Sequence, residues 1–290
     1  MIELIAARLP NLITVFLGIF LEASPFLLLG VLAASALDVL VSQERLARLF
    51  PRNGALGLLT GVALGAAAPL CECGTVPIAR GSVSKGLPLP AAVGFLLAAP
   101  VINPITVAAT YAAFQQDQRM VVLRVGLGVV VALAVGGLFL LWPRQESPLR
   151  STEDVHEHTH CDHTDTSRWL AVLEHTGHEL RSLTIYLVGA CLFAALLQVF
   201  LPRTQLVSWG QGPLLSVAIM MVIAVVLSTC SSVDAFVALA FSTTFSPGAI
   251  LAFLLVSPVL NLKSGALAVG VFRPRMTIPL FGAATFRAYA

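Results

Sequence analysis

The chain has 290 residues, of which 57% are hydrophobic and only 11% are charged, and its mean hydropathy is +0.89. An ordinary soluble domain has a lower apolar share and about twice this charged share, so the composition excludes that class and predicts an integral protein of the lipid bilayer. The formal net charge of +2 gives no indication of nucleic-acid binding, and we expect none.

Apolar stretches long enough to cross a membrane, about 17 to 25 residues each, follow one another along the chain. They occupy residues 12–41, 55–70, 87–114, 121–142, 183–201, 214–229, 250–272 and, more weakly, 278–289. We therefore expect an all-α integral membrane protein with about eight transmembrane helices, four in each half of the chain.

The first stretch has features of a secretory signal, because the small residues 34–36 resemble a cleavage site. Only one basic residue, Arg8, precedes it, however, and Glu22 and Pro25 interrupt its middle. Its counterpart at 183–201 lies about one repeat further along. We expect the first stretch to belong to the folded unit.

A sequence pattern occurs twice, as FLLAAPVIN at 95–103 and FLLVSPVLN at 253–261, with six of nine positions identical. Each copy follows a cysteine-bearing polar break, PLCECGTV in the first half and VLSTCSSV in the second. The halves align at an offset of 157 to 158 residues, which pairs Cys73 with Cys230 and Asn103 with Asn261. Duplicated units with broken helices are typical of transporters.

An even number of spans in each half predicts a parallel repeat, with the two halves entering the membrane from the same side. The short segments 75–79 and 233–241 are expected to be re-entrant or to cross only part of the membrane. We divide the chain into a first transmembrane repeat (1–142), a His-rich polar linker (143–180) and a second transmembrane repeat (181–290).

The linker contains all six histidines of the chain and one cysteine. Imidazole and thiol groups at close spacing suit zinc or copper, although the spacing differs from that of closed structural zinc sites. Two interpretations stay open for the core of the linker: an accessory metal site and an inert solvated loop. The core residues that could bind metal are His156, His158, His160, Cys161 and His163.

Basic residues are concentrated in the loops expected after spans one, three, five and seven. By the positive-inside rule these loops are cytoplasmic, which places the linker and both termini outside. The residues counted for this orientation are Arg45, Arg48, Arg52, Arg119, Arg124, Arg203, Arg273 and Arg275.

Cys71, Glu72 and Cys73 lie between Pro69 and Gly74. On a continuous helix, side chains two positions apart point in nearly opposite directions, but the flanking proline and glycine indicate that a helix ends here. In an extended backbone the two thiolates could bind one soft metal. The alternative is that they fill space in a helix bundle, as free cysteines commonly do and as we expect for Cys191.

Carboxylates at membrane depth are costly and suggest a proton path or a cation site. Glu72 lies within the first cysteine break, Asp234 follows the second, and Glu22 lies inside the first span. Lys263, in the seventh span, is expected to be a buried base or an anion partner. We assign proton coupling to these four residues. Glu72 and Asp234 could instead be solvated at helix ends, and Glu22 could be a satisfied buried carboxyl.

The third and seventh spans are interrupted by Pro100 with Asn103 and by Pro258 with Asn261. Proline frees a backbone carbonyl, and an asparagine one turn later can present polar groups to a cavity. The repeated spacing predicts a role in the substrate path. The full set of predicted substrate-binding residues is Cys71, Glu72, Cys73, Pro100, Asn103, Cys230, Ser231, Asp234, Pro258 and Asn261.

The segment PLCECGTVPIARGSVSKGLPLPAAVGFLLAAPVINPITVAAT resembles the signature of a bacterial family of predicted permeases, which includes trivalent organoarsenical efflux permeases and proposed copper and zinc exporters. The second half matches through LSTCSSVDAFVALA and FLLVSPVLNLKSG. The resemblance implies about eight spans, the bacterial inner membrane and proton-coupled transport of a thiophilic species. It also implies that Cys71, Cys73 and Cys230 are the metal ligands. Glu72 and the APVINP segment depart from the pattern and leave a metal cation open as the substrate.

We interpret the chain as a secondary transporter for a soft metal or metalloid, with no cofactor of its own. The interpretation is compatible with a partner subunit. Two alternatives stay open: efflux specific for organoarsenicals, and a membrane thiol oxidoreductase in which Cys71 and Cys73 cycle between dithiol and disulfide. A two-residue spacing makes a strained disulfide ring, and the sequence has no recognisable redox-cofactor or phosphate-binding motif, so we favour transport over enzyme activity.

Overall fold

The computed structural model describes residues 2–40, 53–141, 165–200 and 212–272. All regular elements in these ranges are helical, as the sequence predicts: α1 (Ile2–Leu40), α3 (Gly54–Ala67), α4 (Glu72–Ser84), α5 (Leu89–Ile102), α6 (Pro104–Ala113), α7 (Arg119–Leu138), the 3₁₀ turn η1 (Phe139–Leu141), α8 (Asp165–Phe200), α10 (Pro213–Leu227), α11 (Asp234–Phe241), α12 (Pro247–Val256) and α13 (Leu262–Val271).

Four segments in the described part of the chain are long and apolar enough to cross a membrane: Leu9–Leu37, Leu89–Ala113, Arg119–Leu141 and Val172–Phe200. The other apolar helices are shorter. A 14-residue helix such as α3 extends only about 21 Å, less than the roughly 30 Å of a bilayer's apolar core. The structure therefore supports a multi-pass helical membrane protein, while eight spans in two repeats remain a prediction. The last predicted span, 278–289, lies outside the described residues.

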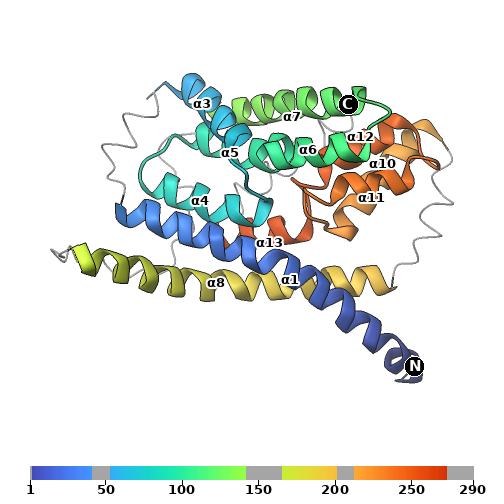
Figure 1. Ribbon diagram of the computed structural model, residues 1–290, viewed down its shortest axis with the longest axis horizontal. Coiled ribbons are helices and arrows are strands. Elements are labelled where there is room, and N and C mark those ends of the chain that lie inside the picture. The colour runs from blue at the N-terminus through green and yellow to red at the C-terminus, as the bar shows by residue number, and fades with distance from the viewer. Residues whose placement is uncertain (1, 41–52, 142–164, 201–211, 273–290) are drawn as a thin grey trace.

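The two long helices α1 and α8 run side by side along one side of the molecule, and α3 and α7 lie along the opposite side (Figure 1). The shorter helices fill the space between them. In this layer α4 packs against α1, α5 and α13, and α11 packs against α6 and α12. Helices of the first half thus contact helices of the second half in the interior.

The interruptions predicted at proline and asparagine are present. Ala68 and Asn103 each precede a proline and adopt extended backbone conformations, with ψ of 118° and 160°, because the proline ring disfavours helical geometry in the preceding residue. In the second half, α12 ends at Val256 and α13 begins after Asn261. The helix ends therefore lie inside the bundle, where they can form a site.

The last part of the predicted linker, residues 165–180, is helical, because α8 begins at Asp165. His175 and His178 consequently lie on this helix. The proposed accessory metal residues, from His156 to His163, lie outside the described residues.

The predicted membrane orientation loses part of its support. Arg119 and Arg124 were assigned to a cytoplasmic loop, but both belong to α7, and Arg124 is fully buried. A buried arginine in a spanning helix says nothing about which loops face the cytoplasm. The remaining residues of that set, Arg45, Arg48, Arg52, Arg203, Arg273 and Arg275, lie outside the described residues.

The close contact of α3 with α5 requires a glycine. A Cβ atom added at Gly61 would overlap the backbone carbonyl of Ala91, whereas one added at Gly126 on α7 would meet nothing within 4 Å. We expect Gly61→Ala to destabilise the protein by about 1 to 3 kcal/mol, because the helices must separate. Thermal unfolding in detergent measures the effect. Gly126→Ala is the matched control, and equal melting temperatures for the two variants would contradict this packing.

Candidate functional site

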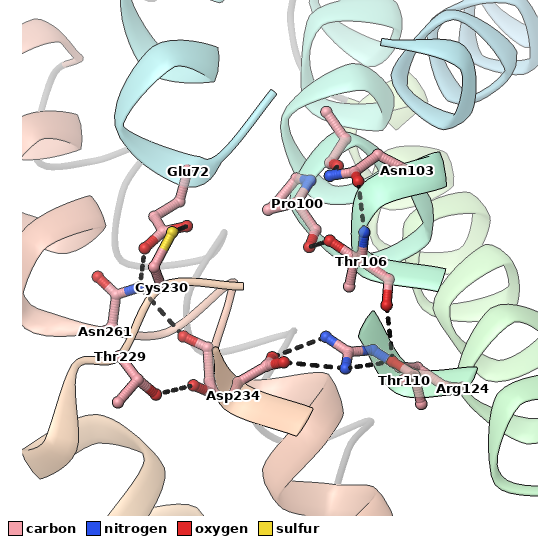
Figure 2. Close-up of polar contacts among 12 residues, drawn as sticks. Glu72, Pro100, Asn103, Thr106, Thr110, Arg124, Thr229, Cys230, Asp234 and Asn261 are labelled. Atoms are coloured by element: carbon pink, nitrogen blue, oxygen red, sulfur yellow. Dashed lines mark hydrogen bonds and ion pairs between the residues drawn. The ribbon is translucent and has the colours of Figure 1, made fainter. Parts of the chain in front are cut away.

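Three side chains from the two cysteine breaks form one buried cluster, which we call the ligand group: Cys71, Glu72 and Cys230. One potential ligand atom from each residue lies within 4.8 Å of the other two. The Cys230 thiol donates to Glu72 Oε2 at 4.0 Å. Figure 2 shows these two side chains next to each other. Two thiols and a carboxylate at this separation could bind a soft metal ion if the three ligand atoms moved slightly closer together.

The backbone at the first break explains how Cys71 and Glu72 can act together. Cys71 is the N-cap of α4 and has extended geometry, with φ of −89° and ψ of 172°, while Glu72 is the first helical residue. The sequence predicted that a helix ends at this point, and the structure confirms it, because α3 ends at Ala67 and α4 begins at Glu72. Cys73 lies in the first turn of α4 and is also buried, but it is outside the ligand group.

The second half contributes an amide and an ammonium group to Glu72. Asn261 Nδ2 donates to Glu72 Oε1 at 3.4 Å and to the carbonyl of Ser257 at 3.0 Å. The Lys263 Nζ atom lies 3.9 Å from the same Glu72 oxygen. It also lies 3.9 Å from Glu22 Oε2 on α1. Three of the four residues predicted for proton coupling are therefore neighbours.

Asp234, the fourth residue predicted for proton coupling, is paired with Arg124 instead. Its two carboxylate oxygens accept hydrogen bonds from Arg124 at 3.0 and 2.7 Å, and Arg124 also donates to Thr110 Oγ1 at 3.0 Å (Figure 2). Both members of the ion pair are fully buried. This bidentate contact joins α7 of the first half to α11 of the second, so the geometry gives Asp234 a connecting position rather than a place among the ligand atoms.

The two duplicated asparagines make equivalent caps but different further contacts. Asn103 Oδ1 accepts from the backbone N–H of Thr106 at 2.8 Å, and Asn261 Oδ1 accepts from that of Ser264 at 2.7 Å. The Asn103 amide, however, donates to the carbonyl oxygens of Leu70 and Ala99. Only Asn261 reaches the ligand group directly.

The remaining predicted site residues are buried near the breaks. Pro100 lies inside α5, and its carbonyl accepts from Thr106 Oγ1 at 3.3 Å, since Pro104 has no N–H to donate to it. Ser231 and Pro258 lie in the turns before α11 and α13. None of these three residues belongs to the ligand group.

Sequence reasoning missed Arg124, Thr110 and the two N3 residues Thr106 and Ser264. A signal existed for the last two, because Asn-x-x-Thr and Asn-x-x-Ser follow the duplicated prolines. For Arg124 the signal was its position inside the predicted span 121–142. A charge inside a span points to a buried partner.

Comparison with known proteins places these residues in a family context. A family model described as "Predicted permease" matches residues 8–288. The chain is 37% identical over 267 residues to UPF0718 protein YcgR of Bacillus subtilis, covering 92% of this chain and 90% of the relative. It is 32% identical over 270 residues to a Streptococcus mutans protein named "Putative two-component membrane permease complex subunit", covering 93% and 90%. No solved structure matches the chain.

The Arg124–Asp234 pair gives a stability prediction. Removing one partner leaves an uncompensated buried charge, so Arg124→Met should cost about 3 to 5 kcal/mol, whereas the double variant Arg124→Met, Asp234→Leu should recover a substantial part. Thermal unfolding in detergent gives both values. Additive losses in the double variant would show that the two side chains do not depend on each other.

Proposed function

This chain belongs to the predicted permease family, and on that premise we propose that it is a secondary transporter that carries a soft metal or metalloid across the bacterial inner membrane. The observation that carries the proposal is the buried ligand group, in which Cys71 and Glu72 from the first half meet Cys230 from the second. Soft thiolate ligands favour ions such as Cu(I) and zinc.

The position of the ligand group supports transport rather than storage. It lies where interrupted helices end, between elements of both halves, and its members are between 2% and 8% exposed. Alternating access moves one half of a transporter against the other around such a site. A movement between α4 and the α10–α11 connection would separate Cys71 and Glu72 from Cys230 and so release the cargo.

Loading of the site requires deprotonation of the two thiols, because thiolate is the form that binds metal. Each loading event would therefore release protons, and unloading would take them up again. This exchange supports coupling to a proton gradient. The neighbours Glu22, Glu72 and Lys263 provide groups through which protons could pass.

A second protein is part of the proposal. The S. mutans relative is named as a subunit of a two-component complex, and this chain matches 90% of its length. We infer that the chain works with a partner subunit. Copurification of an epitope-tagged chain from its native membrane, followed by mass spectrometry, tests this inference.

The cargo prediction uses cells that express the intact protein or single-serine variants, exposed to zinc, copper, arsenite and methylarsenite. Cys71→Ser and Cys230→Ser should abolish the change in accumulation of one cargo, because each removes a ligand from the group. Cys191→Ser is the matched control, since Cys191 is fully buried on α8 and outside the group. Membrane levels of each variant are measured by immunoblot.

Unchanged accumulation in Cys71→Ser and Cys230→Ser, at normal membrane levels, would refute cargo ligation by these thiols. If the intact protein changes no accumulation, but its thiols exchange electrons with a quinone, the oxidoreductase alternative is correct.

A further inference from the structure

Helices α3 and α4 form a hairpin that enters the bundle and turns back, which we call the first hairpin. Gly61 of α3 lies against Ala91 of α5, and Gly65 lies against Ala98, so α3 and α5 run in the same direction. Both helices end at the first break, where the Asn103 amide donates to a backbone carbonyl. Because α5 begins just after α4 ends, α4 leads from the break back toward the side from which α3 came.

Helices α10 and α11 repeat this plan as a second hairpin. At the end of α10, the Ser228 hydroxyl accepts from the backbone N–H of Leu262, and the Thr229 hydroxyl lies 3.3 Å from that of Ser257. Since Ser257 is the C-cap of α12, helices α10 and α12 end together at the second break. α11 then leads from this break toward the start of α12. Its 8 residues extend about 12 Å, which is less than half of a membrane's apolar core.

The long helices that precede the hairpins run in opposite directions. Gly30 of α1 lies next to Gly74 in the first turn of α4. Further along, the Lys85 ammonium at the end of α4 donates to the carbonyl of Leu37. α1 and α4 therefore run the same way, whereas α8 runs past α1 in the reverse direction (Figure 1). Among the described residues three apolar spans precede α8, and an odd number of crossings accounts for this reversal.

Helix α7 shows that the hairpins approach the ligand group from opposite ends of the bundle. Near the start of α7, Arg124 pairs with Asp234, the first residue of α11. Near its end, Gly136 lies against Leu58 of α3. The tips meet between these two ends, because the first hairpin carries two members of the ligand group and the second hairpin carries the third. Figure 1 shows α4 and α11 extending from this point to opposite sides.

We propose that the two halves form an inverted repeat and that the two hairpins are the gates of the transporter, each closing the ligand group from one membrane face. This arrangement replaces the parallel repeat that four spans in each half predict. The inference rests on the proposed function and deepens it: cargo reaches the ligand group from one face when the first hairpin moves, and from the other face when the second hairpin moves. Contact between the two tips corresponds to a site closed on both sides.

An ion pair joins the first hairpin to α8. Arg80, in the second half of α4, donates to Glu179 Oε1 at 3.1 Å, and the two side chains are 25% and 8% exposed. The second hairpin is joined to α7 by the buried bidentate pair of Arg124 and Asp234. Breaking a contact with a partly solvated arginine costs less than separating a buried pair, which would leave two uncompensated charges. The first hairpin therefore opens by separating from α8, while the second moves together with α7.

Membrane sidedness tests the arrangement. Ser84 ends α4, Thr244 follows α11, and both are exposed. Ser84→Cys and Thr244→Cys are made in a Cys161→Ser background, whose four remaining cysteines are buried and should give no labelling of their own. An impermeant maleimide should label one of the two variants in intact spheroplasts and the other only after permeabilisation. A parallel repeat predicts the same face for both.

Access to Cys71 tests the gate, with mass spectrometry of its peptide as the measurement. Glu179→Gln removes the ion pair, so an impermeant methanethiosulfonate should react with Cys71 several-fold faster from the face on which Ser84→Cys is labelled, and at the wild-type rate from the other face. Spheroplasts and inside-out vesicles expose one face each. The matched control Glu174→Gln changes an exposed carboxylate on the same helix and should leave both rates unchanged. The charge swap Arg80→Glu, Glu179→Arg should restore the slow rate.

The outcomes separate the two levels of the hypothesis. Labelling of Ser84→Cys and Thr244→Cys from the same face overturns this inference alone, since cargo accumulation is measured independently. Faster reaction of Cys71 from both faces in Glu179→Gln, or from neither, overturns the gate, because a general loosening of the bundle has no sidedness. Opposite faces in a protein that changes the accumulation of no cargo would support the inverted repeat but overturn the proposed function, and with it the role of the hairpins as gates. If Glu179→Gln does not reach the membrane, Arg80→Gln replaces it.

Discussion

Helix ends inside an apolar bundle must have their free backbone groups satisfied by the protein itself, because the membrane interior supplies no water. Here polar side chains at the breaks satisfy these backbone groups. Asn103 and Asn261 cap α6 and α13 through their side-chain oxygens, and the Ser228 hydroxyl accepts from the backbone N–H of Leu262 at 3.2 Å. These bonds fix the breaks in place, and the positions of Cys71 and Cys230 depend on them.

The duplicated sequence pattern places an asparagine cap in each half of the chain but does not duplicate the charged residues. At the same offset that aligns Cys73 with Cys230, the counterpart of Glu72 is Thr229, and the longer offset that aligns the asparagines gives Ile105 as the counterpart of Lys263. Each charged residue therefore occurs once. The Asn261 amide donates to Glu72, whereas that of Asn103 donates to a backbone carbonyl. One polar cluster thus takes the Glu72 carboxylate from the first half of the chain and Lys263 from the second half.

Sequence patterns predict well what is local and poorly what joins the halves. Proline before a helix end, asparagine at a cap and cysteine beside a carboxylate are visible as short motifs, so the breaks and most of the ligand group could be predicted. Whether Cys71 and Cys73 could bind the same ligand could not be predicted, because this depends on the residue at which α4 begins. The pairing of Arg124 with Asp234 joins residues 110 positions apart and follows only from packing, so no short motif could indicate that Asp234 is bound by an arginine.

The contrast between the two buried cations connects stability with transport. A bidentate arginine–carboxylate pair has fixed geometry and suits a contact that must survive movement of the bundle. Lys263 lies 3.9 Å from an oxygen of each of two carboxylates and has no hydrogen bond to the described residues, so its geometry is less constrained. Transport needs binding that is favourable enough to load and weak enough to unload. Two thiolates with a carboxylate would bind a soft metal strongly, so release would require a movement of the bundle that separates Cys71 and Glu72 from Cys230.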